Sequence, residues 1–189
     1  MSDSSVRPDS WGVLSSLPGN PLMWVLIISE LLVFGAFLLG FGGARLLHPD
    51  LFRAGQAALD VRMGGVNTLL LVTSGLLAAL AVEARRAGRF GAMRRALGGA
   101  GLLGVGFLVI KGMEWSREAA AGHSLDSDTF FTLFYLMTGF HAAHVVMGLA
   151  VLAIIARYDS LENLETGTAF WHMVDMVWLL LFPVLYLTR

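Results

Sequence analysis

The sequence predicts an all-α polytopic membrane protein, folded as a single antiparallel bundle of five transmembrane helices. Its 189 residues are 56% hydrophobic and only 14% charged, with a mean hydropathy of +0.70. Soluble domains carry about 25% charged residues, so composition alone indicates a membrane protein. The apolar residues form five continuous stretches of roughly 20 residues, the length that spans about 30 Å of hydrocarbon. Continuous runs favour helices over a closed barrel, whose strands would alternate.

The five predicted helices lie at about residues 22–44, 64–83, 97–117, 130–156 and 169–187. The connections between them are short and polar, so residues 22–189 are expected to form one membrane domain. Residues 1–21 are expected to form a polar cytoplasmic segment, because they lack the apolar core that a cleaved signal peptide needs. Membrane insertion then depends on the first transmembrane helix itself.

Taken in order, the first stretch carries Glu30, and the second, which starts "GGVNTLLLVTSG", is rich in leucine and valine. The third opens with "LGGAGLLGVG", whose small residues predict the close approach of a neighbouring helix. The fourth contains two histidines in "TGFHAAHVVMG", and the fifth contains "WHMVDMVW". Each of the last two stretches therefore combines ionisable residues with an apolar segment long enough to cross a membrane.

Basic residues in short loops predict the orientation of the chain. The connection "EARRAGRFGAMRR" holds five arginines over residues 85–95, which marks it as cytoplasmic. With five spans, the N-terminus is then inside and the C-terminus outside, in the inner (cell) membrane of a bacterium. Arg45, Arg53 and Arg62 oppose this assignment, because they would lie outside.

Seven ionisable side chains lie within the predicted spans: Glu30, Lys111, Glu114, His141, His144, His172 and Asp175. A charge at the helix centre costs roughly 2.5–3.5 kcal/mol, so these groups are expected to face protein or water, and most of them to pair or stay neutral. Lys111 and Glu114 are i,i+3 neighbours that can neutralise each other. The histidine pair of the fourth stretch and the His–Asp pair of the fifth have the same spacing. At about 1.5 Å of rise per residue, depth groups four of the seven in one internal layer: Glu30, His144, His172 and Asp175.

The residues alone leave three interpretations of this layer open. A glutamate with HxxH and HxxD on two helices is similar to the ligand sets of di-iron helix bundles, although those bundles place several carboxylates at one depth. A proton relay uses the same residue types. A hydrogen-bonded clamp is the usual fate of polar groups between membrane helices.

Four segments carry a family resemblance: "LIISELLVFGAFLLGF", "VNTLLLVTSG", "TGFHAAHVVMGLAVL" and "AFWHMVDMVWLLLFPVLYL". In this order, from about residue 22 to 187, they resemble subunit III of the haem–copper oxidases. The segments "VIKGMEWSREAAAG" and "FFTLFY", with "FP" near the end, are similar to the NorE-type branch associated with nitric oxide reductase systems.

The family motifs match Glu30, Glu114, His141, His144, His172, Asp175 and Trp178. In the family these positions are not haem or copper ligands, because the redox centres belong to other subunits. The resemblance therefore implies no cofactor, metal or catalytic residue in this chain. It gives His141 and His144 a role as interior polar clamps that fix how the fourth and fifth helices pack.

The resemblance also implies a function and partners. The chain is expected to be a non-catalytic membrane subunit or accessory protein that supports the stability, assembly or proton supply of a redox subunit. Its expected partners are a catalytic haem-containing membrane subunit of an oxidase or nitric oxide reductase, and membrane lipids. Full-length members have seven helices in two bundles around a lipid cleft, whereas this chain begins at what resembles the third helix.

Residue counts exclude some other classes of site and function and leave others open. The chain has no cysteine, which excludes disulfides and thiolate metal sites, and its net charge of −1 gives no reason to expect a nucleic-acid partner. A centre with two haems and one copper needs six histidines and the chain has five, which still allows a single-haem protein. An independent small channel or transporter would use the intramembrane layer, but the sequence shows no inverted repeats or broken helices.

Overall fold

The computed structural model describes residues 21–158 and 160–188, and over these residues it is all helical. Five helices are long and apolar enough to cross a membrane: α1 (Pro21–Leu47), α3 (Val61–Arg86), α4 (Phe90–Ala120), α5 (Thr129–Arg157) and α6 (Leu161–Phe182). A π-helical segment, Pro183–Leu187, continues α6, and a short helix, α2 (Pro49–Ala58), follows α1. The five predicted spans are confirmed as helices, and each helix extends beyond its apolar stretch.

Capping residues account for where several helices begin. Asp60 before α3, Asp128 before α5 and Ser160 before α6 each accept a hydrogen bond from a backbone N–H of the following first turn. Such caps satisfy donors that have no partner within the helix. The helices therefore start at these polar residues in the connections rather than at the first apolar residue.

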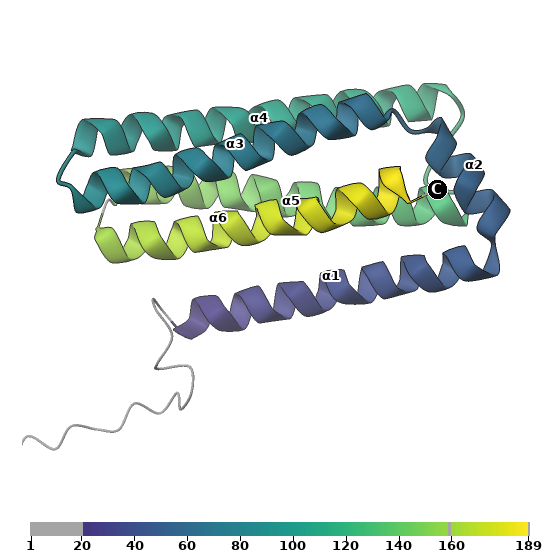
Figure 1. The fold of residues 1–189 in the computed structure, drawn as a ribbon, viewed down its shortest axis with the longest axis horizontal. Coiled ribbons are helices and arrows are strands. Elements are labelled where there is room, and N and C mark those ends of the chain that lie inside the picture. The colour runs from purple at the N-terminus through teal and green to yellow at the C-terminus, as the bar shows by residue number, and fades with distance from the viewer. Residues whose placement is uncertain (1–20, 159, 189) are drawn as a thin grey trace, which may run out of the picture.

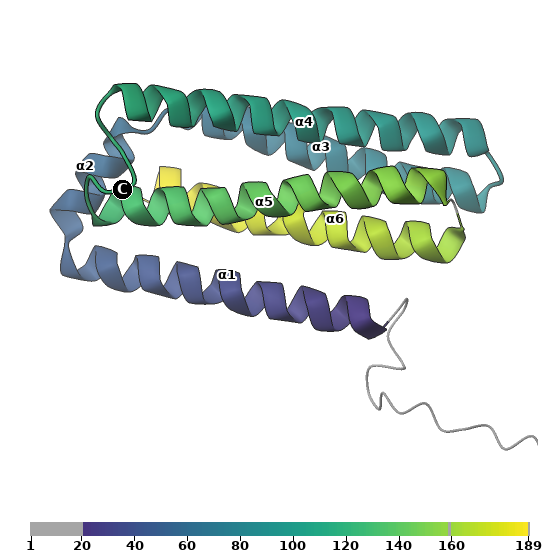
Figure 2. The ribbon, with the colours of Figure 1, turned by 180° about the vertical axis from the view of Figure 1, so that it is seen from behind.

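Helices α3 to α6 form a ring in which α3 and α5 each contact both α4 and α6, and neighbours run antiparallel (Figure 1). Helix α1 lies along α5 and α6 on the outside of this ring, as the view from behind also shows (Figure 2). Among the α1 side chains that the structure describes, Phe34 and Phe41 alone are buried. The tightly packed unit is therefore α3–α6, with α1 at its edge.

The glycine-rich start of the third span packs against two neighbours. A Cβ on Gly99 would lie 2.9 Å from Leu77 of α3, and a Cβ on Gly104 would lie 2.7 Å from Trp171 of α6. Real Cβ atoms need more room, so the rigid Trp171 ring requires a glycine at position 104, whereas the Leu77 methyl near Gly99 can move aside. Gly98 is different, because a Cβ there would meet no heavy atom within 4 Å.

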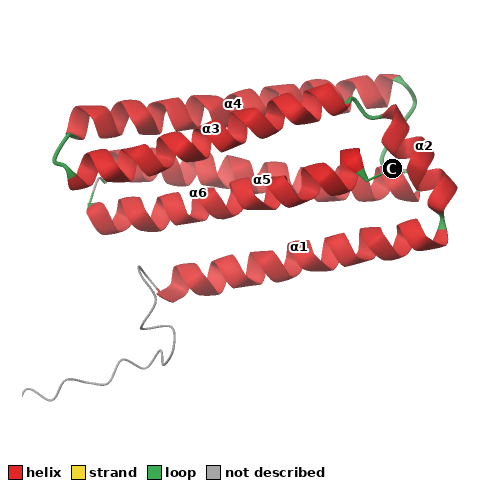
Figure 3. Ribbon diagram, viewed as in Figure 1, coloured by secondary structure: helices red, strands yellow, loops and turns green. Residues whose placement is uncertain are grey.

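Helix α2 crosses the end of the ring, where the sequence predicted a connection without structure of its own (Figure 3). Phe52 packs edge-on against Phe41 and Phe130, with ring centroids 4.9 and 5.5 Å away. The amide of Gln56 donates to the carbonyl of Val184 at 2.9 Å. Helix α2 thus joins α1, α5 and the C-terminal π-helical segment.

Candidate functional site

Lys111 lies at the centre of a closed hydrogen-bonded network between α4 and the C-terminal segment. Its ammonium donates to Glu114 Oε2 at 2.5 Å and to the Tyr186 hydroxyl at 2.8 Å. The Tyr186 hydroxyl donates in turn to Glu114 Oε1 at 2.7 Å. All three side chains are fully buried, so the charge of the lysine is balanced inside the protein, as its spacing from the glutamate predicted.

Aromatic rings enclose the rest of the Lys111 ammonium. The nitrogen lies 4.6 Å from the ring centroid of Trp178, 5.4 Å from that of Tyr186 and 5.5 Å from that of Phe134. Ring faces attract cations most strongly where water is excluded. The lysine is thus the cation that these three rings surround.

Glu30 and His144 join α1 to α5. His144 Nε2 lies 2.9 Å from Glu30 Oε2, and His144 Nδ1 lies 2.8 Å from the carbonyl of Phe140. A carbonyl only accepts, so Nδ1 carries a proton. Glu30 Oε2 has no hydrogen-bond partner among the described residues, so the two side chains approach closely without a well-aligned hydrogen bond.

His141 faces the interior instead. Its ring lies 5.4 Å from Trp178 and 5.5 Å from Phe107, centroid to centroid. Neither ring nitrogen has a hydrogen-bond partner within the described part of the chain. The predicted contact with α6 is therefore corrected for His144, which faces Glu30 of α1, whereas His141 contacts α6 through the ring of Trp178. A spacing of three residues turns a helix by about 300°, so the two side chains diverge by about 60°.

Asn67 is a further buried polar residue, and it lies outside the set predicted from the sequence. It is fully buried on α3, and neither its amide oxygen nor its amide nitrogen has a partner among the described residues. The next residue, Thr68, accepts a hydrogen bond from the indole of Trp178 at 3.0 Å. The α3–α6 contact at this depth is thus made by a threonine and a tryptophan, and Asn67 adds amide groups to the core.

His172 and Asp175 lie on the opposite side of the ring from the Glu30–His144 pair, against α3. Their closest nitrogen–oxygen distance is 3.9 Å, too long for a hydrogen bond, and His172 is partly exposed. Asp175 is buried against Gly75, where a Cβ would collide with the carboxyl group. The expected link from Asp175 to a histidine or to another helix is absent among the described residues, where neither carboxyl oxygen has a hydrogen-bond partner.

The described residues contain no group of three or more histidine, aspartate and glutamate side chains arranged to hold a metal ion. Their buried ionisable groups face one another in pairs or pack against rings. This arrangement places polar and aromatic contacts between helices.

Two polar contacts at the α2 end of the ring involve residues other than the ionisable ones predicted within the spans. His123 Nδ1 lies 2.9 Å from Glu118 Oε2, and its ring stacks on Phe131. Asp60 forms an ion pair with Arg117 at 3.1 Å. Partial burial raises the pKa of Asp60, but hydrogen bonds from backbone N–H groups and from Arg117 outweigh it and hold the pKa below its ordinary value.

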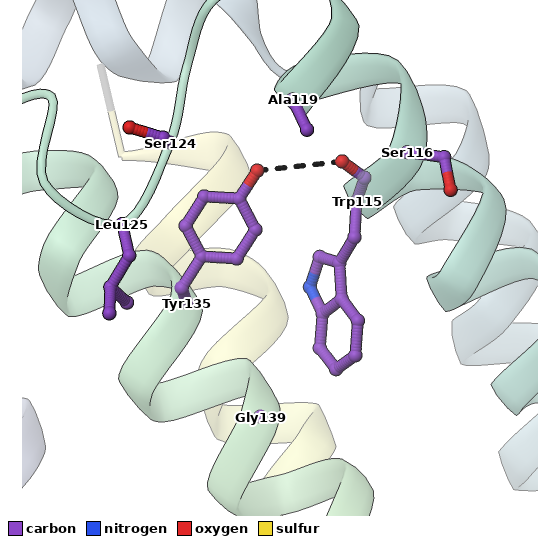
Figure 4. Close-up of a pocket in the computed structure, with 7 residues that line it drawn as sticks. All are labelled: Trp115, Ser116, Ala119, Ser124, Leu125, Tyr135 and Gly139. Atoms are coloured by element: carbon purple, nitrogen blue, oxygen red, sulfur yellow. Dashed lines mark hydrogen bonds between the residues drawn. The ribbon is translucent and has the colours of Figure 1, made fainter.

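An open pocket of about 550 Å³ lies between the end of α4 and the start of α5 (Figure 4). Trp115 and Tyr135 form its walls, and the Tyr135 hydroxyl donates to the carbonyl of His123 at 2.8 Å. The hydroxyl of Ser116 donates to the carbonyl of Gly112 at 2.9 Å. With no charged side chain in its lining, this pocket offers apolar surface rather than catalytic groups.

Known proteins resemble the chain along most of its length. The family described as cytochrome c oxidase subunit III matches residues 20–188. Cytochrome c oxidase subunit 3 of Bacillus subtilis is 31% identical over 176 residues, 82% of this chain and 85% of that protein. The same subunit of Thermostichus vulcanus is 30% identical over 175 residues, 87% of this chain and 85% of that protein.

A longer relative is the heme-copper oxidase subunit I+III of Aeropyrum pernix. It is 29% identical over 179 residues, which make up 87% of this chain but only 22% of that protein. This chain therefore spans about a fifth of the fused relative and most of each separate subunit. The match over residues 20–188, together with five membrane-spanning helices, shows that the chain belongs to the cytochrome c oxidase subunit III family.

Proposed function

We propose that the chain is a non-catalytic membrane subunit of a respiratory redox complex, where it supports the stability, assembly or proton supply of a haem-containing catalytic subunit. The family match over residues 20–188 carries this proposal. The interior polar contacts support it, because Lys111 and Glu114 of α4 both bind Tyr186 of the C-terminal segment, and Glu30 of α1 approaches His144 of α5.

The finer proposal is that the complex is of the nitric oxide reductase type. It rests on the resemblance of "VIKGMEWSREAAAG" and "FFTLFY" to the NorE-type branch. The first of these segments contains Lys111 and Glu114, and the second contains Phe134, one of the rings around the lysine. The segments that carry the finer resemblance thus contribute to the same buried network.

We further propose that the chain lies in the inner membrane of a bacterium as one five-helix unit with a cytoplasmic N-terminus. The arginines of residues 85–95 support this orientation. The sequence has no cysteine, so single cysteines at Arg89 and Ser124 can be labelled without background. A membrane-impermeant reagent on the periplasmic side should label Ser124→Cys and miss Arg89→Cys; the reverse pattern would overturn the orientation.

Affinity purification of the tagged chain in mild detergent tests the function. The proposal predicts that a larger membrane subunit co-purifies and that the complex shows a haem spectrum. Mass spectrometry of that subunit decides between an oxidase and a nitric oxide reductase. A chain that purifies alone and carries one haem, or that conducts ions in liposomes without a partner, would contradict the proposal.

A further inference from the structure

A partly exposed histidine lies on the outer surface of α6, beside α3. These two helices pack together on the near side of Figure 1, whereas α4 and α5 are on the near side of Figure 2. The side chain of His172 is 43% exposed. It is eleven residues from the start of α6 at Leu161, about 16 Å along the helix axis. This position is near the middle of a hydrocarbon layer of about 30 Å.

A buried carboxyl group without a partner lies beside this histidine. Asp175 is only 7% exposed, and neither of its carboxyl oxygens has a hydrogen-bond partner in the described part of the chain. Gly75 of α3 makes room for both side chains, because a Cβ there would collide with the carboxyl group and lie 3.4 Å from His172 Nδ1. The α3–α6 contact therefore accommodates two polar side chains that do not satisfy each other.

The surface around the histidine is apolar. Val72 and Leu76 of α3 and Met176 and Leu179 of α6 are between 45% and 58% exposed. Met176 and Leu179 follow His172 by four and seven residues, and Leu76 follows Val72 by four, spacings that place side chains on one face of a helix. These four residues and His172, the His172 face, form an apolar surface with one polar group at mid-depth. Interfaces between transmembrane helices combine apolar packing with isolated hydrogen bonds in this way.

We propose that a transmembrane helix of the partner subunit docks on the His172 face and presents a hydrogen-bond donor to the imidazole. This rests on the proposed function, which supplies the larger membrane subunit. A neutral histidine has one N–H and one free acceptor nitrogen. The N–H can turn to the Asp175 carboxyl, and the other nitrogen then accepts from the partner helix, so one contact satisfies both side chains.

Two other occupants leave the histidine unsatisfied. Lipid tails offer neither donor nor acceptor, and polar groups that face hydrocarbon are costly. A second copy of the chain would bring two His172–Asp175 pairs together. Its N–H groups would be used by the two carboxyls, and both remaining imidazole nitrogens would lack a donor.

Photocrosslinking in the complex, purified with the tagged full-length chain, tests the location of this surface. A photoreactive amino acid at Leu76 or Leu179 should crosslink to the larger subunit. The matched control is Val146 on α5, which is 55% exposed and should not. Crosslinks to that subunit from Val146 alone, a crosslinked dimer of the chain, or no protein crosslink from Leu76 and Leu179 would overturn the proposal. If the larger subunit still co-purifies, the proposed function survives these outcomes; if it does not, both fail.

Substitutions of His172 test the hydrogen bond. His172→Leu should lower retention of the larger subunit about three- to tenfold, the range for one hydrogen bond between membrane helices. Melting of the isolated chain should not change, because the side chain is partly exposed and forms no hydrogen bond with Asp175. His172→Gln keeps a donor and an acceptor and should retain the subunit nearly as well as the wild type. Unchanged retention in His172→Leu, or a loss that matches a lower melting temperature of the isolated chain, would overturn the proposal.

Discussion

A lysine ammonium inside a membrane-spanning helix is stable only where its charge is matched, and Lys111 meets this condition within its own chain. Glu114 supplies the opposite charge, and Tyr186 satisfies both partners. The network also joins α4 to the C-terminal π-helical segment, 75 residues further along the chain. Its expected role is to fix that segment against the ring of helices.

Removing one of the two charges of this network should strongly destabilise the protein. Lys111→Met leaves the Glu114 carboxylate buried without its opposite charge, with the Tyr186 hydroxyl as its remaining donor, which should destabilise the protein by about 3–5 kcal/mol. The double variant Lys111→Met, Glu114→Gln removes both charges and should lose less than Lys111→Met alone. Melting in detergent measures both effects.

The exposed ion pair between Arg86 and Glu165 is the control for this comparison. Arg86→Met should cost about 0–1 kcal/mol, because water already screens the pair. The single variant Glu114→Gln completes the comparison. If the stability lost by the double variant equals the sum of the losses of Lys111→Met and Glu114→Gln, the two residues are not energetically coupled.

The Glu30–His144 pair predicts a difference between two substitutions of one residue. In Glu30→Gln the amide can donate to His144 Nε2, so little stability should be lost. Glu30→Ala leaves that nitrogen unpaired, at a cost of about 1–3 kcal/mol, and should loosen α1. Melting measures the loss of stability, and disulfide trapping between cysteines placed on α1 and α5 measures how firmly α1 is held. An equal loss of stability in the two variants would show that an amide cannot replace the carboxylate.

Sequence reasoning identified the ionisable residues of the interior but not all of their partners. Glu114 was predictable as the partner of Lys111, because i,i+3 spacing is a local property. Tyr186 was not, because its approach to Lys111 depends on how α4 and α6 pack. Asn67 could not be singled out in "VNTLLL", because its side chain is uncharged and the search was for ionisable residues. Its side chain is nevertheless fully buried, like that of His141.

Among the helices, Gly104 of α4 leaves the space that the Trp171 ring of α6 occupies. Gly104→Val would push against the Trp171 ring, and overpacking of this kind typically costs about 1–3 kcal/mol. Gly112→Val is the matched control on the same helix, because a Cβ at Gly112 meets nothing within 4 Å. Thermal melting of both variants should show a clear loss only for Gly104→Val; equal losses would mean that helix propensity alone is responsible.

The start of α3 predicts a dependence of stability on pH. Asp60 has a folded-state pKa below the ordinary 3.8, so its contribution is present above that value and is lost as the pH falls through the lower folded pKa. Asp60→Asn keeps an N-cap but cannot titrate. The stability difference between wild type and variant should therefore shrink between about pH 5 and pH 2, as followed by melting in detergent; a constant difference would argue against the ion pair with Arg117.

Helix α2 illustrates an element that hydropathy misses. Its sequence, "PDLFRAGQAA", is too short and too polar to span a membrane, so hydropathy predicts only a connection between two spans here. Pro49 at its first position and Asp50 in its first turn are typical of a helix start. Its buried face could not be recognised before Phe41 and Phe130 were known to lie beside Phe52.

At the scale of the whole molecule, the five spans and their antiparallel order followed from apolar length and short connections alone. The position of α1 did not, because its apolar residues give no preferred face. It lies against α5 and α6 with most of its surface exposed. In the membrane that surface meets lipid or another subunit, which agrees with a chain that works beside a larger partner.

We expect this chain to contribute no redox centre to the complex in which it works. The most direct test is the ratio of haem to catalytic subunit, measured optically and by quantitative protein analysis, in complexes purified with and without the chain. An unchanged ratio is the predicted result. A ratio that falls by one haem for each chain removed, with that haem recovered on the isolated chain, would show that the chain does hold a redox centre.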